Sequence, residues 1–159
     1  MESLYFGSEK KLPTTEYLLY SNKEYSTSYK EKVRDKAKRE FSSDFLNAKK
    51  EKENIDEARK LINECVRQIR GKVKGGRLIL NRNIEYGFFR NLAAGSFIAL
   101  PFSLYSIYFF TVDFSSPLAA KVEIFSSVVF GTLLLSSYPL LKFLGKNYAN
   151  TLYQEYLSS

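Results

Sequence analysis

The stretch LAAGSFIALPFSLYSIYFFTV, residues 92–112, decides the fold of this chain, because it runs for 21 residues without a charged side chain. A helix of that length rises about 31 Å, which matches a bilayer hydrocarbon core of about 30 Å. A second uncharged stretch, IFSSVVFGTLLLSSYPLL, covers residues 124–141 and extends to residue 144 if Lys142 snorkels to the headgroups. Since backbone amides in lipid must bond within their own segment, both stretches are predicted to be transmembrane helices.

Charge is distributed unevenly along the 159 residues. Residues 91–159 carry three basic and three acidic side chains, so the whole net charge of +7 lies in residues 1–90. A buried helical hairpin in a soluble protein is the alternative, but so few charges leave too little polar surface to cover it. The predicted fold class is all-α, with a cytosolic helical basic region followed by a two-span transmembrane helical hairpin.

Basic side chains flank the outer ends of both predicted spans, whereas the connecting residues 113–123 hold one lysine and two acids. The flanking residues are Arg77, Arg82, Arg90, Lys142 and Lys146. The positive-inside rule then predicts a multi-pass protein of the inner cell membrane with both termini in the cytoplasm. A cleaved signal peptide is not expected, because the first apolar run begins only at residue 92.

Four segments are predicted along the chain. Residues 1–42 are rich in Ser, Tyr and Lys, residues 43–91 form the basic helix and an interfacial segment, residues 92–144 form the hairpin, and residues 145–159 form a short interfacial helix. The first segment is either a solvated tail or a segment that a partner orders, because LPTTEYLLY at residues 12–20 carries aromatic and aliphatic surface.

One long helix is predicted over residues 43–73, with Ser43 or Asp44 as its N-cap. Seven of nine positions on a 3.5-residue seam are apolar, and Lys52 and Arg59 occupy the other two. The apolar positions are Phe45, Ala48, Ile55, Ile62, Val66, Ile69 and Val73. This pattern is typical of a coiled coil that joins two copies, and packing against residues 27–41 of the same chain is the alternative.

A basic cluster lies in RQIRGKVKGGRLILNR, residues 67–82, where no acid interrupts the run. It consists of Arg67, Arg70, Lys72, Lys74, Arg77 and Arg82, and its glycines are expected to end the preceding helix. Such a cluster beside a membrane attracts anionic phospholipid headgroups, at about 1 kcal/mol per basic residue. It either binds headgroups or only sets topology, and these roles are compatible. Direct nucleic-acid binding is not expected, because no RNA- or DNA-binding fold signature accompanies the charge.

Two further segments show apolar or tyrosine side chains four residues apart, as in a helix lying at a membrane interface. These side chains are Leu80, Ile84 and Phe88 before the first span and Tyr148, Leu152 and Tyr156 after the second.

Small side chains form a seam along each span. The helix-packing positions predicted from them are Gly95, Ala99, Ser103 and Ser106 in the first span and Ser127 and Gly131 in the second. Small residues let helix backbones approach closely in lipid, and hydroxyls bond across helices. The seams either pack the hairpin on itself or join copies into a multimer whose seams line a polar path.

Several chemistries are excluded by composition. The chain has no His and a single cysteine, Cys65, so it has no Ser–His or Cys–His nucleophile pair and no zinc site. Phosphate-binding glycine loops are absent from the sequence. No enzyme, cofactor or metal is therefore expected, and catalytic residues are predicted to be none.

Residues 43–157 combine a basic helical module, two short spans with small polar seams, and no catalytic motif. In this layout the chain resembles the two-span membrane effectors of prokaryotic antiviral systems. These include effectors associated with short Argonautes and SLATT-type effectors. The resemblance implies that a soluble sensor partner triggers the protein, which then forms a homo-oligomer and permeabilises or depolarises the infected cell's membrane. It carries no site residue over. The alternative function is a non-toxic adaptor that anchors a soluble complex to the membrane.

Overall fold

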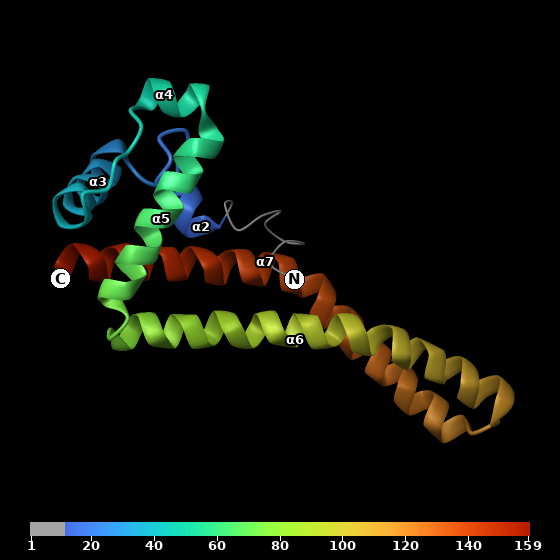
Figure 1. The fold of residues 1–159 in the computed structure, drawn as a ribbon. Coiled ribbons are helices and arrows are strands. Elements are labelled where there is room, and N and C mark those ends of the chain that lie inside the picture. The colour runs from blue at the N-terminus through green and yellow to red at the C-terminus, as the bar shows by residue number, and fades with distance from the viewer. Residues whose placement is uncertain (1–11) are drawn as a thin grey trace. The chain divides into compact units, whose positions relative to one another are not determined.

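The computed structural model describes residues 12–159, which are helical apart from short turns and contain no β-strand (Figure 1). The all-α prediction is thus confirmed for this part of the chain. The chain divides into two compact units. The terminal unit combines the chain up to Tyr86 with Lys142–Ser159, and the hairpin unit is Gly87–Leu141.

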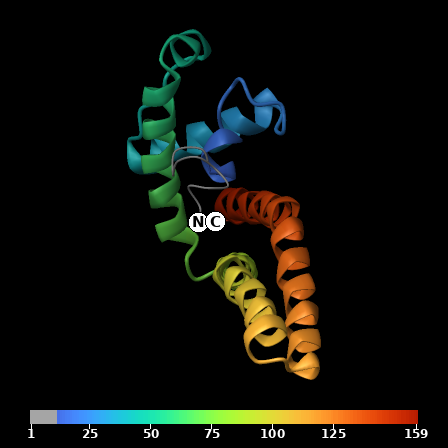
Figure 2. The same cartoon turned by 90° about the vertical axis from the view of Figure 1, so that its right-hand side faces the viewer.

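Within residues 12–159, the terminal unit contains four helices of its own and shares two others with the hairpin unit. Its own helices are α2 (Pro13–Glu16), α3 (Thr27–Phe41), α4 (Ala48–Glu53) and α5 (Ile55–Val73). The unit also holds the first turns of α6 (Arg77–Tyr108) and the last turns of α7 (Pro117–Ser158). Figure 2 shows α2 and α3 lying beside α5.

The single helix predicted over residues 43–73 is wrong, because Asn54 divides it into α4 and α5. The Asn54 backbone leaves the helical region, with φ −135° and ψ 75°, and its side chain caps α5 by accepting a hydrogen bond from the Glu57 amide at 3.3 Å. Asn47 caps α4 in the same way, so neither Ser43 nor Asp44 is the N-cap. Gly71 lies within α5, and the chain turns only at residues 74–76.

The core of the terminal unit forms around one face of α5. Its buried side chains come from α5, from the segment that follows α2, from α3 and from the end of α7. Examples are Ile62, Val66 and Ile69 of α5, which are at most 1% exposed. The second half of the apolar seam predicted to form a coiled coil, Ile62 to Val73, is therefore buried inside the chain, as in the packing alternative, whereas Ala48 and Ile55 of its first half are exposed.

Residues 12–20 pack on their own chain, with Leu18 and Leu19 fully buried. The Tyr153 hydroxyl of α7 donates to the Thr14 carbonyl, which ties this segment to the end of α7. The interpretation as a solvated tail is therefore wrong for these residues, and residues 1–11 lie outside the described part. The separate helix predicted over residues 145–159 is also wrong, because α7 continues unbroken to Ser158 and buries Leu152 and Tyr156 in the core.

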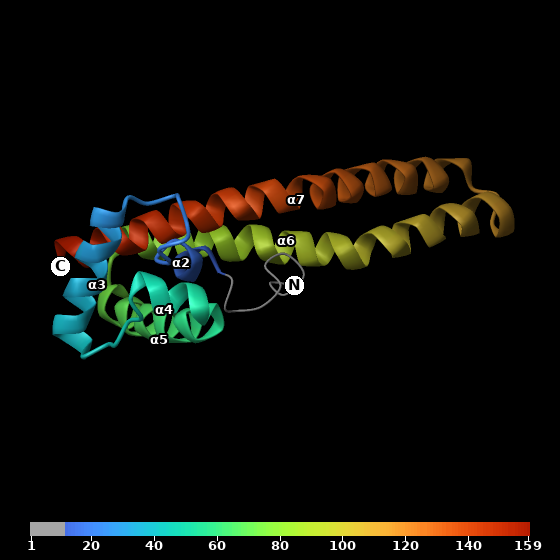
Figure 3. The ribbon, with the colours of Figure 1, turned by 90° about the horizontal axis from the view of Figure 1, so that it is seen from above.

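The hairpin unit consists of two antiparallel helical arms joined at a short tip, as Figure 3 shows. The first arm is the rest of α6 followed by the π-helix η2 (Phe109–Asp113), and the second is α7 up to Leu141. The connection predicted over residues 113–123 is shorter than expected, because α7 begins at Pro117, where proline suits the first helical turn. Residues 117–123 are therefore part of the second arm.

Candidate functional site: the apolar hairpin and its polar seam

The exterior of the hairpin unit is apolar. Its helices belong to segments that are long and apolar enough to cross a membrane, Arg77–Asp113 and Pro117–Ser158, whose most apolar windows have mean hydropathies of 1.5 and 1.7. Only 17% and 6% of their most apolar windows are buried inside the chain. A core helix of a soluble protein would be mostly buried instead. Phe102 and Leu135, for example, are 69% and 85% exposed, so the hairpin turns its large apolar side chains outward.

The interior of the hairpin is lined by small side chains. The small buried positions are Ala93, Ser96 and Ser103 on the first arm and Ala120 and Ser137 on the second, and Leu141 is also buried at the end of the unit. Small residues at this interface allow the two backbones to lie close together. Ser103 of the first-span seam, together with the nearby Ser96, therefore packs the hairpin on itself.

Three polar side chains meet between the arms and form a cluster of Ser103, Glu123 and Ser127. The Ser103 hydroxyl donates toward the Glu123 carboxylate Oε2 at 2.8 Å and the Glu123 backbone oxygen at 3.0 Å. Ser127 donates to the Ser103 hydroxyl oxygen at 3.0 Å. Ser103 is the twelfth of the 21 uncharged residues of the first predicted span. The structure thus brings a carboxylate against the interior of that span.

The seams of small residues predict Ser103 and Ser127 but not Glu123. Glu123 is the last charged residue before the second uncharged stretch, so the sequence pattern places it in the connection. Helical spacing is the signal that could have found it, because Glu123 lies four residues before Ser127 and shares its helix face.

The glycines of the seams do not contact the opposite arm. A Cβ atom built at Gly95 or at Gly131 would meet nothing within 4 Å. Ala99 and Ser106 are half-buried. Gly95 and Gly131 therefore leave room on the hairpin for the close approach of another helix.

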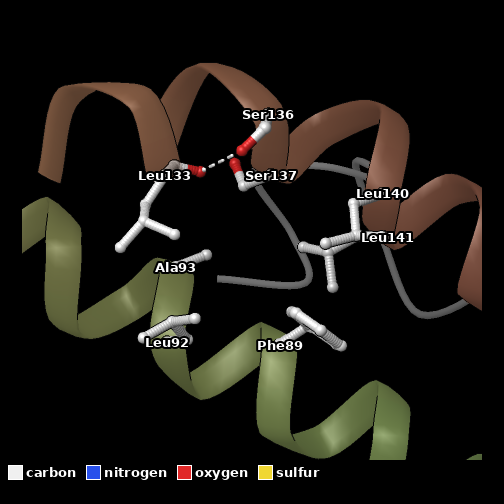
Figure 4. A pocket seen from close by; sticks show the side chains of 8 residues that line it. All are labelled: Phe89, Leu92, Ala93, Leu133, Ser136, Ser137, Leu140 and Leu141. Carbon is white, nitrogen blue, oxygen red and sulfur yellow. Dashed lines mark hydrogen bonds between the residues drawn. The ribbon is translucent and has the colours of Figure 1, made fainter. Parts of the chain in front are cut away.

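A small cavity of about 30 Å³ also lies between the arms, and Figure 4 shows the residues that line it. Its two hydroxyls bond within their own helix, Ser136 to the carbonyl of Leu133 at 3.2 Å and Ser137 to the carbonyl of Leu134 at 2.6 Å. With its hydroxyls satisfied and room for about one water, the cavity offers nothing to hold a larger ligand.

The predicted lipid-binding cations lie in different environments within the terminal unit. Arg70 donates to the Thr14 hydroxyl at 3.0 Å and lies 5.5 Å from the Tyr148 ring. Lys72 pairs with Glu40 at 2.7 Å, and this hydrogen bond lowers the pKa of the Glu40 carboxyl. Arg82 pairs with Glu85 at 2.8 Å. Arg70, Lys72 and Arg82 are thus engaged inside the unit.

The other three cluster cations are Arg67, Lys74 and Arg77, and all of them are exposed. Lys74 and Arg77 flank the turn between α5 and α6 and form no ion pair with any of residues 12–159. They are the cluster members best placed for an outside anion.

A buried ion pair, not anticipated from the sequence, fastens the start of the described chain to α3 and α4. Arg34 pairs with Glu51 at 2.7 Å, and both side chains are less than 5% exposed. The Arg34 guanidinium also donates to the Leu18 carbonyl at 2.6 Å and lies 4.0 Å from the centre of the Tyr20 ring. Burial of a charge requires such partners, and here Arg34 and Glu51 compensate each other.

The described residues hold no group of three or more His, Cys, Asp or Glu side chains that could bind a metal ion. Burial raises the pKa of the Cys65 thiol to about 11, so the thiol is neutral near pH 7 and is a poor nucleophile.

Comparison with known proteins finds no matching family model, no matching curated protein and no matching solved structure.

Proposed function

We propose that this chain is a membrane effector: its hairpin unit inserts into the inner cell membrane, and copies of it assemble to permeabilise or depolarise that membrane. The observation that carries the proposal is the reversed polarity of the hairpin unit. Large apolar side chains lie outside it, and hydroxyls and a carboxylate lie between its arms. A lipid solvent favours this arrangement, whereas water disfavours it.

Insertion of the hairpin is supported by the apolar exterior on both arms. Polar hydroxyls on the exposed side bond back to their own helix, as Thr132 does to the Val128 carbonyl at 2.8 Å, so they do not require water. Both termini belong to the terminal unit, and its cations are expected to hold that unit in the cytoplasm at an anionic lipid surface.

Assembly of several copies is supported by Gly95 and Gly131. Association of helices in lipid depends on close packing, and both glycines leave such packing open because none of the residues that the structure describes fills the space beside them. A single hairpin of two helices encloses no path for ions, so permeabilisation requires more than one copy.

A soluble sensor protein is proposed to hold the effector quiet and then trigger it. The partner would act on the terminal unit, whose helices α3 and α4 expose many charged side chains. No enzymatic step is part of the proposal.

The test is to express the chain with and without its genomic neighbours and to record membrane potential and growth. We expect depolarisation when the partner is triggered. The variants Gly131→Ile and Ala99→Ile should reach the membrane, because Ile is favourable in a span, and should no longer depolarise it. Full toxicity of both variants would contradict assembly through the seams.

The adaptor function is favoured over the effector function by one outcome. If the wild-type chain localises to the membrane and recruits its partner but never changes the potential, the chain is an anchor. The compact, internally packed terminal unit is compatible with that role.

A further inference from the structure

We propose that Ser103, Glu123 and Ser127 form a binding site for a proton or a monovalent metal cation inside the hairpin, and that this site makes the permeation path selective for cations over anions. This inference rests on the proposed function and adds to it the class of ion that passes.

The Glu123 carboxylate lies at the inner face of the hairpin. The Glu123 side chain turns between the arms, where its Oε2 atom accepts from Ser103, a residue that is only 5% exposed. Glu123 itself is half-buried, so one side of its carboxylate can be reached from outside the seam. An ion passing between assembled hairpins, outside the seam, would meet this reachable side of the carboxylate.

The charge of Glu123 is not compensated by a cation of the described chain. Glu123 forms no ion pair with any of residues 12–159, although Lys121 lies only two residues away. Acids of the terminal unit differ, since Glu51 pairs with Arg34 and Glu16 pairs with Arg59, each at 2.7 Å. A carboxylate among apolar helices is costly without a partner cation, and such residues in membrane segments mark ion or proton pathways.

The cluster around the Glu123 carboxylate consists of oxygen atoms. Glu123 Oε2, the Glu123 backbone oxygen and the two serine hydroxyl oxygens are connected by hydrogen bonds of 2.8–3.0 Å. All four are hard oxygen atoms, which suit a proton or an alkali cation. The hydroxyl protons can rotate, so the serines can donate to the carboxylate when the site is empty and offer lone pairs to a cation when it is filled.

The position of Glu123, its uncompensated charge and the oxygen atoms around it together predict selectivity for cations over anions. A negative group on a permeation path attracts cations and repels anions, as rings of acidic side chains do in cation channels. An assembly of several hairpins would bring several copies of Glu123 to one depth in the membrane. The selectivity would then depend on Glu123, while the ability to conduct would depend on assembly.

The test uses the full chain reconstituted into planar bilayers, with reversal potentials measured in a KCl gradient. We expect a wild-type current selective for K⁺ over Cl⁻ and a permeability ratio that falls toward unity in Glu123→Gln. The matched control is Asp113→Asn, which removes an exposed acid of η2 and should leave the ratio unchanged. A second measurement in symmetrical KCl with a pH gradient distinguishes the ions, because a reversal shift there identifies the proton as the bound species.

A second pair of variants separates the site from a general effect on folding. Ser127→Ala removes the hydrogen bond to Ser103 and should lower the ratio, whereas Ser126→Ala removes the neighbouring hydroxyl, which is not part of the cluster, and should not. Circular dichroism and liposome flotation verify that each variant is helical and inserted.

Current that is equally cation-selective in the wild type and in Glu123→Gln would overturn the site while leaving the effector function standing. Current without any selectivity in the wild type would do the same. Absence of current under all conditions would overturn both proposals.

Discussion

The terminal unit and the hairpin unit place polar and apolar side chains in opposite ways. The terminal unit buries leucine, isoleucine and tyrosine side chains in its core and exposes most of its lysines, as a protein in water does, apart from Leu78, Leu80 and Ile84, which are exposed at the start of α6. The hairpin unit exposes phenylalanine, isoleucine and leucine and keeps Ser103 and Ser137 inside. The difference indicates that one chain is adapted to two solvents, and α6 and α7 pass from one to the other.

Buried charge shows the same contrast. In the terminal unit the Glu51 carboxylate is paired with Arg34, whereas in the hairpin unit Glu123 has only hydroxyl partners among the described residues. The first arrangement holds segments together, and the second leaves a charge available for an ion.

The largest expected effect in this comparison comes from breaking the buried pair. Glu51→Ala leaves the Arg34 guanidinium buried without its carboxylate, which should destabilise the terminal unit by about 3–5 kcal/mol. Hydrogen exchange of the full chain in detergent micelles measures the loss of stability. We expect the amides of α3 and α5 to exchange faster and those of the hairpin unit to exchange as in the wild type. Glu53→Ala is the control, because Glu53 is exposed on the same helix, and it should change stability by less than about 0.5 kcal/mol. Equal protection in both variants would show that the pair does not hold the unit together.

The next effect compares two leucines on one helix. Leu152 of α7 is fully buried in the terminal unit, and Leu135 of the same helix is 85% exposed in the hairpin unit. Leu152→Ala should destabilise the terminal unit by about 2–5 kcal/mol because it leaves a cavity, whereas Leu135→Ala should leave its stability unchanged. Thermal unfolding of both variants in micelles provides the measurement. A loss of stability at Leu135 similar to that at Leu152 would mean that the hairpin exterior is packed against protein.

A smaller effect concerns lipid binding by the basic cluster. Lys74 and Arg77 should contribute about 1 kcal/mol each to the attraction of anionic lipid, whereas Lys72 and Arg82 should contribute less because each already pairs with an acid. This contribution is measured with two double variants, Lys74→Gln/Arg77→Gln and Lys72→Gln/Arg82→Gln, each placed in nanodiscs of mixed neutral and anionic lipid. Native mass spectrometry then records how much anionic lipid each variant retains. The first should retain less, and the difference should shrink at high salt. If both double variants retain as much anionic lipid as the wild type, the basic cluster does not bind headgroups and only sets the membrane topology.

Sequence patterns predicted the hairpin unit better than the terminal unit. Two long uncharged stretches suffice to predict two exposed apolar helices, because length and composition are local properties. The break at Asn54 was not predicted, since the apolar seam continues through it and only the capping geometry of the side chain interrupts the helix. The burial of Tyr153 against Thr14 depends on residues far apart in the chain, which no local pattern records.

The candidate site divides in the same way. The periodicity of small residues predicted that Ser103 and Ser127 would line a helix interface, and the structure joins them by a hydrogen bond. Glu123 was missed because a charge was taken as the end of a span. In the basic cluster the sequence showed six cations, but which of them are already paired depends on the fold, as with Lys72 and Glu40.

The central claim is that the hairpin unit faces lipid while the terminal unit faces water. The most direct test attaches nitroxide spin labels to cysteines at Leu135 and, as a matched position on the terminal unit, at Glu53, in a Cys65→Ala background reconstituted in liposomes. Collision with oxygen, which concentrates in lipid, is compared with collision with a water-soluble nickel chelate. The account predicts that the label at position 135 is accessible to oxygen and shielded from nickel, and that the label at position 53 shows the reverse. High nickel accessibility at position 135 would contradict it.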